Sequence, residues 1–155
     1  MHRTHGSKTF SVASCDAFQG CSSRELRAIE RLGTEITTAA GTRLCSEDAT
    51  QPQFVVVLDG SVEICRSGEL VGTIGRGDCF GHAPLLAGSV TERVTAIAAA
   101  PSYLLVFARH EFRALLDAAP SLATRLQREA AAAVPAGAPH PATPTRAQRS
   151  AFATA

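Results

Sequence analysis

One segment of this 155-residue chain has residue types and spacing that suit the binding of an anion. It is residues 75–97, GRGDCFGHAPLLAGSVTERVTAI. Gly75, Gly77 and Gly81 punctuate the start of the segment, and Pro84 with two leucines then predicts a short helix. Backbone N–H groups at a helix start have no intrahelical partner and are able to hold a phosphate. The segment therefore indicates a strand, a turn and a helix arranged around a small anionic ligand.

The periodicity of apolar residues predicts the elements that must position this segment. Ser22 and Glu25 have the spacing of a capping box, which predicts a helix that begins there and ends at Gly33. Short runs in which apolar and polar residues alternate then predict strands, because each run is bounded by Gly, Asp or Pro. These runs are 35–37, 42–45, 54–58, 62–64, 70–74, 94–98 and 103–107.

Two dipeptides predict turns, and helical periodicity returns after the last strand. Asp59-Gly60 predicts a two-residue hairpin between its flanking strands, and Ser67-Gly68 predicts the turn that follows. Two closing helices are expected at 109–116 and 121–132, separated at Pro120. The order predicts a mainly β fold with flanking helices, in which an antiparallel roll of about eight strands is closed by C-terminal helices.

The chain is expected to have one folded domain between two polar ends. Residues 1–17 lack periodicity and predict a loose arm, residues 18–133 the domain, and residues 134–155 a Pro/Ala-rich tail that is disordered. A formal net charge of +1 gives no support for a nucleic-acid or acidic-membrane partner. No run reaches the roughly 18–20 apolar residues of a membrane span.

The cysteines and other reactive side chains indicate neither a disulfide scaffold nor an enzyme. Five cysteines without CxxC pairs predict reduced thiols and a cytoplasmic protein. Cys79 and His82 have a C-x-x-H spacing, but zinc needs about four ligands and no second cluster accompanies them. Cys15, Cys21 and Cys45 fit a four-cysteine iron–sulfur set poorly. Since no nucleophile motif frames the polar residues, no metal site and no catalytic residue are expected.

The segments VVLDGSVEI and GRGDCFG, and their spacing to EFRALL, resemble the catabolite-activator-like domains of the cyclic-nucleotide-binding family. The resemblance covers about residues 18–133 and implies a jelly-roll-like double-stranded β-helix. The phosphate-binding cassette of that family reads FGE-x-x-LL, then an Arg after a few residues. Here His82 stands where the family has its ribose-binding Glu, and Thr91 stands near its phosphate-binding Arg. The positions that match are Phe80, Gly81, Leu85 and Leu86.

The resemblance implies a regulatory domain whose ligand is cAMP, cGMP or a related small molecule. A neutral His82 ring accepts one hydrogen bond, more weakly than a carboxylate. Arg93 either reaches the ligand in place of Thr91 or is a solvated arginine beside Glu92. Pro84 suits the first turn of a helix, but it also removes one amide from the cassette. The ligand-binding residues implied are Phe80, Gly81, His82, Ala83, Leu85, Leu86, Thr91 and Arg93.

Two hypotheses about function follow from these substitutions. In the first, the chain is a stand-alone sensor domain that binds a cyclic nucleotide weakly and shifts its closing helices in response. In the second, the domain has lost its ligand and acts as an interaction or homodimerisation module through its C-terminal helices.

Overall fold

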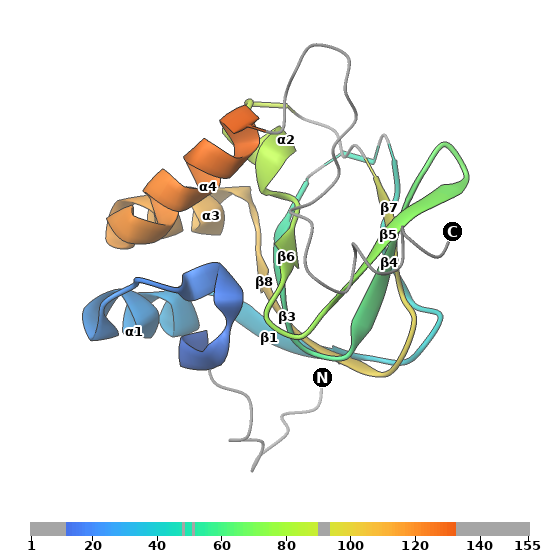
Figure 1. The fold of residues 1–155 in the computed structure, drawn as a ribbon, viewed down its shortest axis with the longest axis horizontal. Coiled ribbons are helices and arrows are strands. Elements are labelled where there is room, and N and C mark those ends of the chain that lie inside the picture. The colour runs from blue at the N-terminus through green and yellow to red at the C-terminus, as the bar shows by residue number, and fades with distance from the viewer. Residues whose placement is uncertain (1–11, 48, 51, 90–93, 133–155) are drawn as a thin grey trace.

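Two four-stranded antiparallel sheets face each other in the computed structural model, which describes residues 12–47, 49–50, 52–89 and 94–132 (Figure 1). The first sheet has the order β1 (Thr34–Thr38), β8 (Ser102–Phe107), β3 (Phe54–Asp59), β6 (Cys79–Phe80). The second has the order β2 (Arg43–Cys45), β7 (Thr95–Ala98), β4 (Ser61–Arg66), β5 (Glu69–Gly75). The predicted antiparallel roll is confirmed.

The three longer helices lie on the outer side of the first sheet, away from β4, β5 and β7 (Figure 1). They are α1 (Ser23–Leu32), α3 (Arg109–Ala118) and α4 (Pro120–Ala132), and the short α2 (His82–Leu86) follows β6. The capping box of α1 is formed as predicted. The Ser22 hydroxyl accepts the Glu25 amide at 3.1 Å, and the Glu25 carboxylate accepts the Ser22 amide at 2.7 Å.

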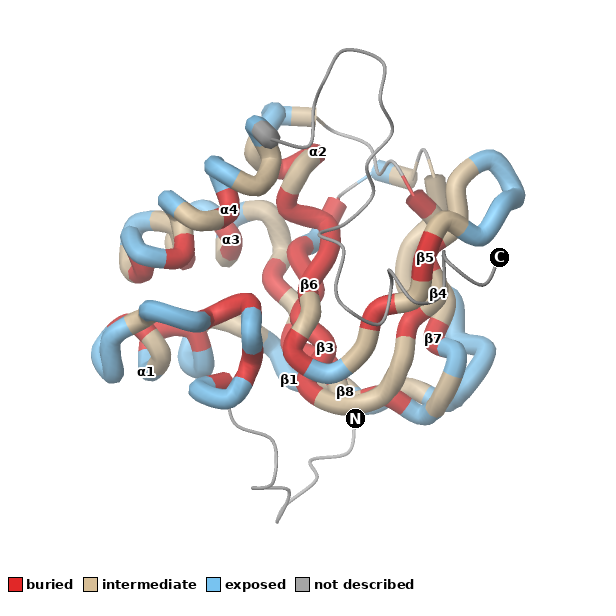
Figure 2. The backbone as a smooth tube through the Cα atoms, in the orientation of Figure 1, coloured by how far each residue is buried: buried red, intermediate tan, exposed pale blue. Residues whose placement is uncertain are grey.

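Strand β3 is buried on both faces and separates two hydrophobic clusters, as the buried stretch of the tube at β3 shows (Figure 2). Phe54, Val56 and Leu58 pack against the helices. Val55 and Val57 belong to the second cluster, between the two sheets. Because side chains alternate along a strand, the unbroken apolar run of β3 serves both clusters at once.

The two predicted turns have different outcomes. Ser67 and Gly68 both have positive φ, 53° and 81°, and close a two-residue hairpin between β4 and β5 as predicted. The hairpin predicted at Asp59-Gly60 is wrong, because β3 and β4 belong to different sheets. Gly60 instead forms the corner between the sheets, at φ +111°, where a Cβ atom would lie 2.7 Å from the Ser102 Cα.

Residues 12–17 also differ from the expected loose arm. Val12–Ser14 and Asp16–Phe18 form 3-10 turns, and Val12, Ala17 and Phe18 are buried in the cluster beneath the helices. The Ala17 amide donates to the Gly77 carbonyl at 3.1 Å. A few apolar residues in single turns have no period for a sequence pattern to detect. The rest of the predicted arm and the predicted tail at 134–155 lie outside the described residues.

The Glu25 carboxylate accepts backbone amides at the starts of both α1 and α4. The stability of the domain therefore depends on the charge of Glu25. Its second carboxylate oxygen accepts the Ser121 amide at 2.9 Å, and the amides of Ser22 and Ser121 hold the pKa of Glu25 below its usual value. This contribution is complete above the unfolded pKa of about 4.3 and is lost as the pH falls through the folded pKa.

We therefore expect acidification from pH 6 to pH 3 to lower the melting temperature of the wild type more than that of Glu25→Gln. Glu25→Ala should lower the free energy of unfolding by about 2 kcal/mol, because it removes both bonds. Glu30→Gln, on the exposed side of α1, is the control. If acidification lowers the melting temperatures of Glu25→Gln and wild type equally, the Glu25 carboxylate is not the group that makes stability depend on pH.

Candidate functional site

Gly81 places the segment 80–89, here called the cassette segment, directly against strand β3. It has φ +95°, and a Cβ atom at this position would lie 1.9 Å from the Gln53 carbonyl oxygen. Only glycine combines that dihedral with so close an approach of two backbones. The cassette segment therefore begins at a fixed point on the first sheet.

A hydrogen-bonded turn before Gly81 anchors the cassette segment from the other side. The Asp78 carboxylate accepts the Gly75 amide at 2.9 Å, so Asp78 is the turn residue that its position predicts. The Gly77 amide donates to the Val57 carbonyl at 2.7 Å, and the Val57 amide donates to the Asp78 carbonyl at 2.8 Å. This turn is thus held against the middle of β3.

The short helix α2 forms as predicted, with Pro84 in its first turn. The N–H of any other residue at this position would have no acceptor within the helix, so the missing N–H of proline does not weaken α2. The Pro84 carbonyl accepts the Ser89 amide at 2.8 Å, which closes the segment after α2. At five residues, α2 is too short to be stable alone and depends on packing against α4.

His82 faces the helices. Its Nε2 lies 3.9 Å from the Glu129 Oε1 of α4, and its side chain is 5% exposed. The imidazole ring meets Phe54 edge-on, with centroids 6.0 Å apart, and Phe54 is on the helix-covered face of the first sheet. The sequence predicted that His82 could accept a hydrogen bond from a ligand, but its Nε2 is directed at α4.

Polar contacts extend from His82 across α4 to the N-terminal turns. The Arg125 Nε lies 3.2 Å from the second Glu129 carboxylate oxygen, and another Arg125 nitrogen donates to the Asp16 carbonyl. At the other end of the cassette segment, Arg109 of α3 donates to the Ser89 carbonyl. The cassette segment is therefore attached to both closing helices.

The remaining predicted site residues divide between the two clusters. Phe80 is buried between the sheets, whereas Leu85 and Leu86 pack with the helix-covered cluster. Ala83 is half-buried. Thr91 and Arg93, the candidates for contact with a phosphate, lie outside the described residues.

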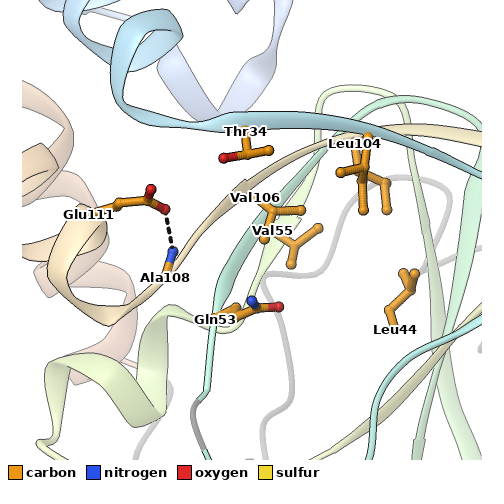
Figure 3. Close-up of a pocket in the computed structure, with 9 residues that line it drawn as sticks. Thr34, Leu44, Gln53, Val55, Leu104, Val106, Ala108 and Glu111 are labelled. Carbon is orange, nitrogen blue, oxygen red and sulfur yellow. Dashed lines mark hydrogen bonds between the residues drawn. The ribbon is translucent and has the colours of Figure 1, made fainter. Parts of the chain in front are cut away.

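A cavity of about 390 Å³, which the sequence did not predict, lies inside the roll (Figure 3). Its walls come from β1, β2, β3 and the continuous stretch from β8 into α3, four separate parts of the chain that no sequence motif connects. None of Phe80, Gly81, His82, Ala83, Leu85 and Leu86 lines it. The lining residues are Thr34, Ile36, Leu44, Gln53, Val55, Leu104, Val106, Ala108 and Glu111.

Cys15 and Cys79 behave as small buried apolar residues in this fold. None of the five cysteines, all of which the structure describes, is in a disulfide. Burial raises the pKa of Cys15 to about 11 and raises that of Cys79 still further, so both thiols stay protonated near neutral pH. Within the described residues, no three His, Cys, Asp or Glu side chains gather closely enough to hold a metal ion.

The family model for the cyclic nucleotide-binding domain matches residues 35–119, more than half of the chain, from the second residue of β1 to just past the end of α3. The chain belongs to the cyclic nucleotide-binding domain family. Domains of this family are regulatory and typically non-enzymatic. In the described part of this domain, no helix is both long and apolar enough to cross a bilayer.

Three similar proteins place the domain among its relatives. It is 26% identical over 103 residues to the Pycsar effector protein PaPycTIR of Pseudomonas aeruginosa, covering 66% of this chain and 33% of that one. The domain thus spans about a third of that relative's length. The second cyclic-nucleotide domain of a PKA regulatory subunit, solved with Sp-2Cl-cAMPS, superposes with a TM-score of 0.69 at 17% identity, covering 78% and 80% of the two chains.

The third is a structure from work on a cyclic-GMP-dependent signalling pathway that regulates bacterial phytopathogenesis. It is 27% identical with a TM-score of 0.60, and the match covers 72% of this chain and 91% of that one.

We expect Gly81→Ala to destabilise the domain far more than Gly88→Ala. Both glycines have positive φ, which costs about 1–2 kcal/mol for alanine, but nothing lies within 4 Å of a Cβ at Gly88. At Gly81 the Cβ would also collide with the Gln53 carbonyl. Denaturant unfolding of the two variants measures the difference in the free energy of unfolding. Equal losses of that free energy would contradict the close approach of Gly81 to the Gln53 carbonyl.

We expect a double-mutant cycle with His82→Leu and Glu129→Gln to give a coupling on the order of 0.5–1 kcal/mol. Leucine keeps the packing on Phe54 while removing the polar edge that faces Glu129. A cycle of Glu129→Gln with His110→Gln, an exposed histidine of α3, is the control. Additive effects of His82→Leu and Glu129→Gln would show that the pair does not interact.

Proposed function

We propose that this domain is a regulatory sensor that binds a cyclic nucleotide at the cassette segment with low affinity and responds through α4. The observation that carries the proposal is the packing of α2 on α4, with His82 facing Glu129. Because α2 depends on that packing, a ligand that repositions the cassette segment also alters the surroundings of α4.

The proposed affinity follows from the two replaced side chains. Each charged hydrogen bond contributes roughly 1.5–3 kcal/mol, so a cassette without the family's Glu and Arg should lose about two to four powers of ten in affinity. In our proposal Phe80, Gly81, Ala83, Leu85 and Leu86 shape the site. Either Thr91 or Arg93 contacts the phosphate of the ligand. His82 connects the site to α4.

The type of ligand is supported by the family and by its relatives. The PKA domain was solved with a cAMP analogue, and the 27% identical structure belongs to work on cyclic-GMP-dependent signalling. We therefore propose cAMP or cGMP as the ligand class and a cytoplasmic site of action. The Pycsar effector protein is about three times as long as the region that matches this domain. If this domain is likewise part of a larger protein, we propose that the effector activity lies outside it.

Calorimetric titration with cAMP and cGMP tests the proposal. We expect dissociation constants well above micromolar for the wild type and tighter binding after His82→Glu with Thr91→Arg. Because a glutamate at position 82 would face Glu129, Glu129→Gln is added to the double variant to remove that repulsion.

Arg93→Ala and Arg31→Ala separate a specific cation from general charge, since Arg31 is an exposed residue of α1. If Arg93 contacts the phosphate, only Arg93→Ala weakens wild-type binding. Micromolar or tighter binding by the wild type would reject the low-affinity cassette.

A second candidate function is supported by the use of His82 in packing. If neither wild type nor the triple variant binds a cyclic nucleotide, the domain is better described as an interaction or dimerisation module that acts through its closing helices. Sedimentation equilibrium of the unliganded chain then distinguishes a homodimer from a monomer that awaits another protein.

A further inference from the structure

No described residue of the cassette segment lines the cavity inside the roll, although Val55 in its floor pairs with Phe80. Its floor is formed by inward-facing side chains of the first sheet, Val55 and Leu104, which are 4% and 0% exposed. Leu44 closes it from the second sheet. His82 lies on the opposite, helix-covered face of the first sheet, so a ligand in the cavity would not touch it.

The cavity has an apolar interior and a polar end. Figure 3 shows Glu111 at one side of the view and Leu44 at the other, with Val55 and Val106 between them. Thr34 and Gln53, both exposed, add a hydroxyl and an amide. A volume of about 390 Å³ is within the range of small-molecule sites, roughly 300–1,000 Å³.

Glu111 sets the charge of this site. The Ala108 amide donates to its Oε1 at 2.8 Å, which holds the carboxylate at the start of α3, and no hydrogen bond from a described residue occupies the second oxygen. Glu111 is the only charged residue among the described lining residues, which include no Lys, Arg or His. A phosphate is therefore disfavoured here, whereas an ammonium or another N–H donor is favoured.

We propose that this cavity is a second small-molecule site, which takes a ligand with an apolar ring or chain and an amine head. The apolar part lies among Ile36, Leu44 and Leu104, and the amine donates to the Glu111 carboxylate. Because no described cassette residue lines this site, its test does not require that the domain bind a cyclic nucleotide.

Tryptamine is a suitable probe, because it joins an indole ring to a primary amine. The chain has no tryptophan, so indole fluorescence reports the probe alone. We expect saturable binding with a shift of the emission to shorter wavelength, and binding several-fold weaker for indole-3-acetate, which carries a carboxylate in place of the amine. The absence of saturable tryptamine binding, or equal binding of both probes, overturns the proposal.

Glu111→Gln tests the amine contact without removing the helix cap, because glutamine at this position also completes a capping box. We expect tryptamine binding to weaken roughly three- to tenfold and indole-3-acetate binding to change little. Glu35→Gln is the matched control, since Glu35 is on β1 but accepts the Tyr103 hydroxyl outside the cavity lining. Equal effects of Glu111→Gln and Glu35→Gln would contradict the assigned contact.

Val106→Phe tests the location by filling the cavity. We expect it to weaken both probes at least tenfold while thermal unfolding followed by circular dichroism shows a folded chain. Unchanged binding by a folded Val106→Phe places the probe elsewhere and overturns the proposal. If this variant does not fold, the comparison of the two probes and the Glu111→Gln result still decide it.

Discussion

The close approach of Gly81 to the Gln53 carbonyl fixes where the cassette segment leaves the first sheet. A Cβ at position 81 would be 1.9 Å from that oxygen, so the backbone passes directly beside the start of β3, where β6 is already paired with that strand. From this point the chain turns to the helix-covered face of the first sheet. His82 is consequently buried against Phe54 and faces Glu129 of α4.

This placement gives the domain two separate environments on either side of one sheet. On the helix side, polar contacts join the cassette segment to α4 and, through Arg125, to the turn at Asp16. Inside the roll, the described lining of the cavity is mostly aliphatic, with a hydroxyl, an amide and the Glu111 carboxylate. The first environment suits the transmission of a conformational change, and the second suits a small ligand that lacks a phosphate.

Sequence patterns predicted the parts of the fold that depend on neighbours along the chain. The capping box at Ser22 and Glu25 and the hairpin at Ser67-Gly68 each involve residues no more than three apart, so local spacing was sufficient. Asp59-Gly60 has the same local signal, but its flanking strands pair with other partners in different sheets. A dipeptide does not contain that information, because strand pairing is decided by the whole roll.

The candidate site was predictable only in part for the same reason. The motif located Phe80, Gly81 and the short helix, since their types and order are local. It did not show that His82 would face Glu129, 47 positions later in the chain. The cavity was not predictable, because Thr34 and Glu111 approach it from distant elements and no pattern relates them.

Hydrogen exchange of α4 tests the central claim, that occupancy of the cassette segment reaches this helix. The measurement compares the amides of residues 121–132 with and without cAMP or cGMP, at a ligand concentration above the dissociation constant found by calorimetry. The account predicts that exchange changes in residues 81–88 and 121–132, while the β4–β5 hairpin stays the same. A ligand that occupies the protein and leaves exchange in α4 unchanged would contradict it.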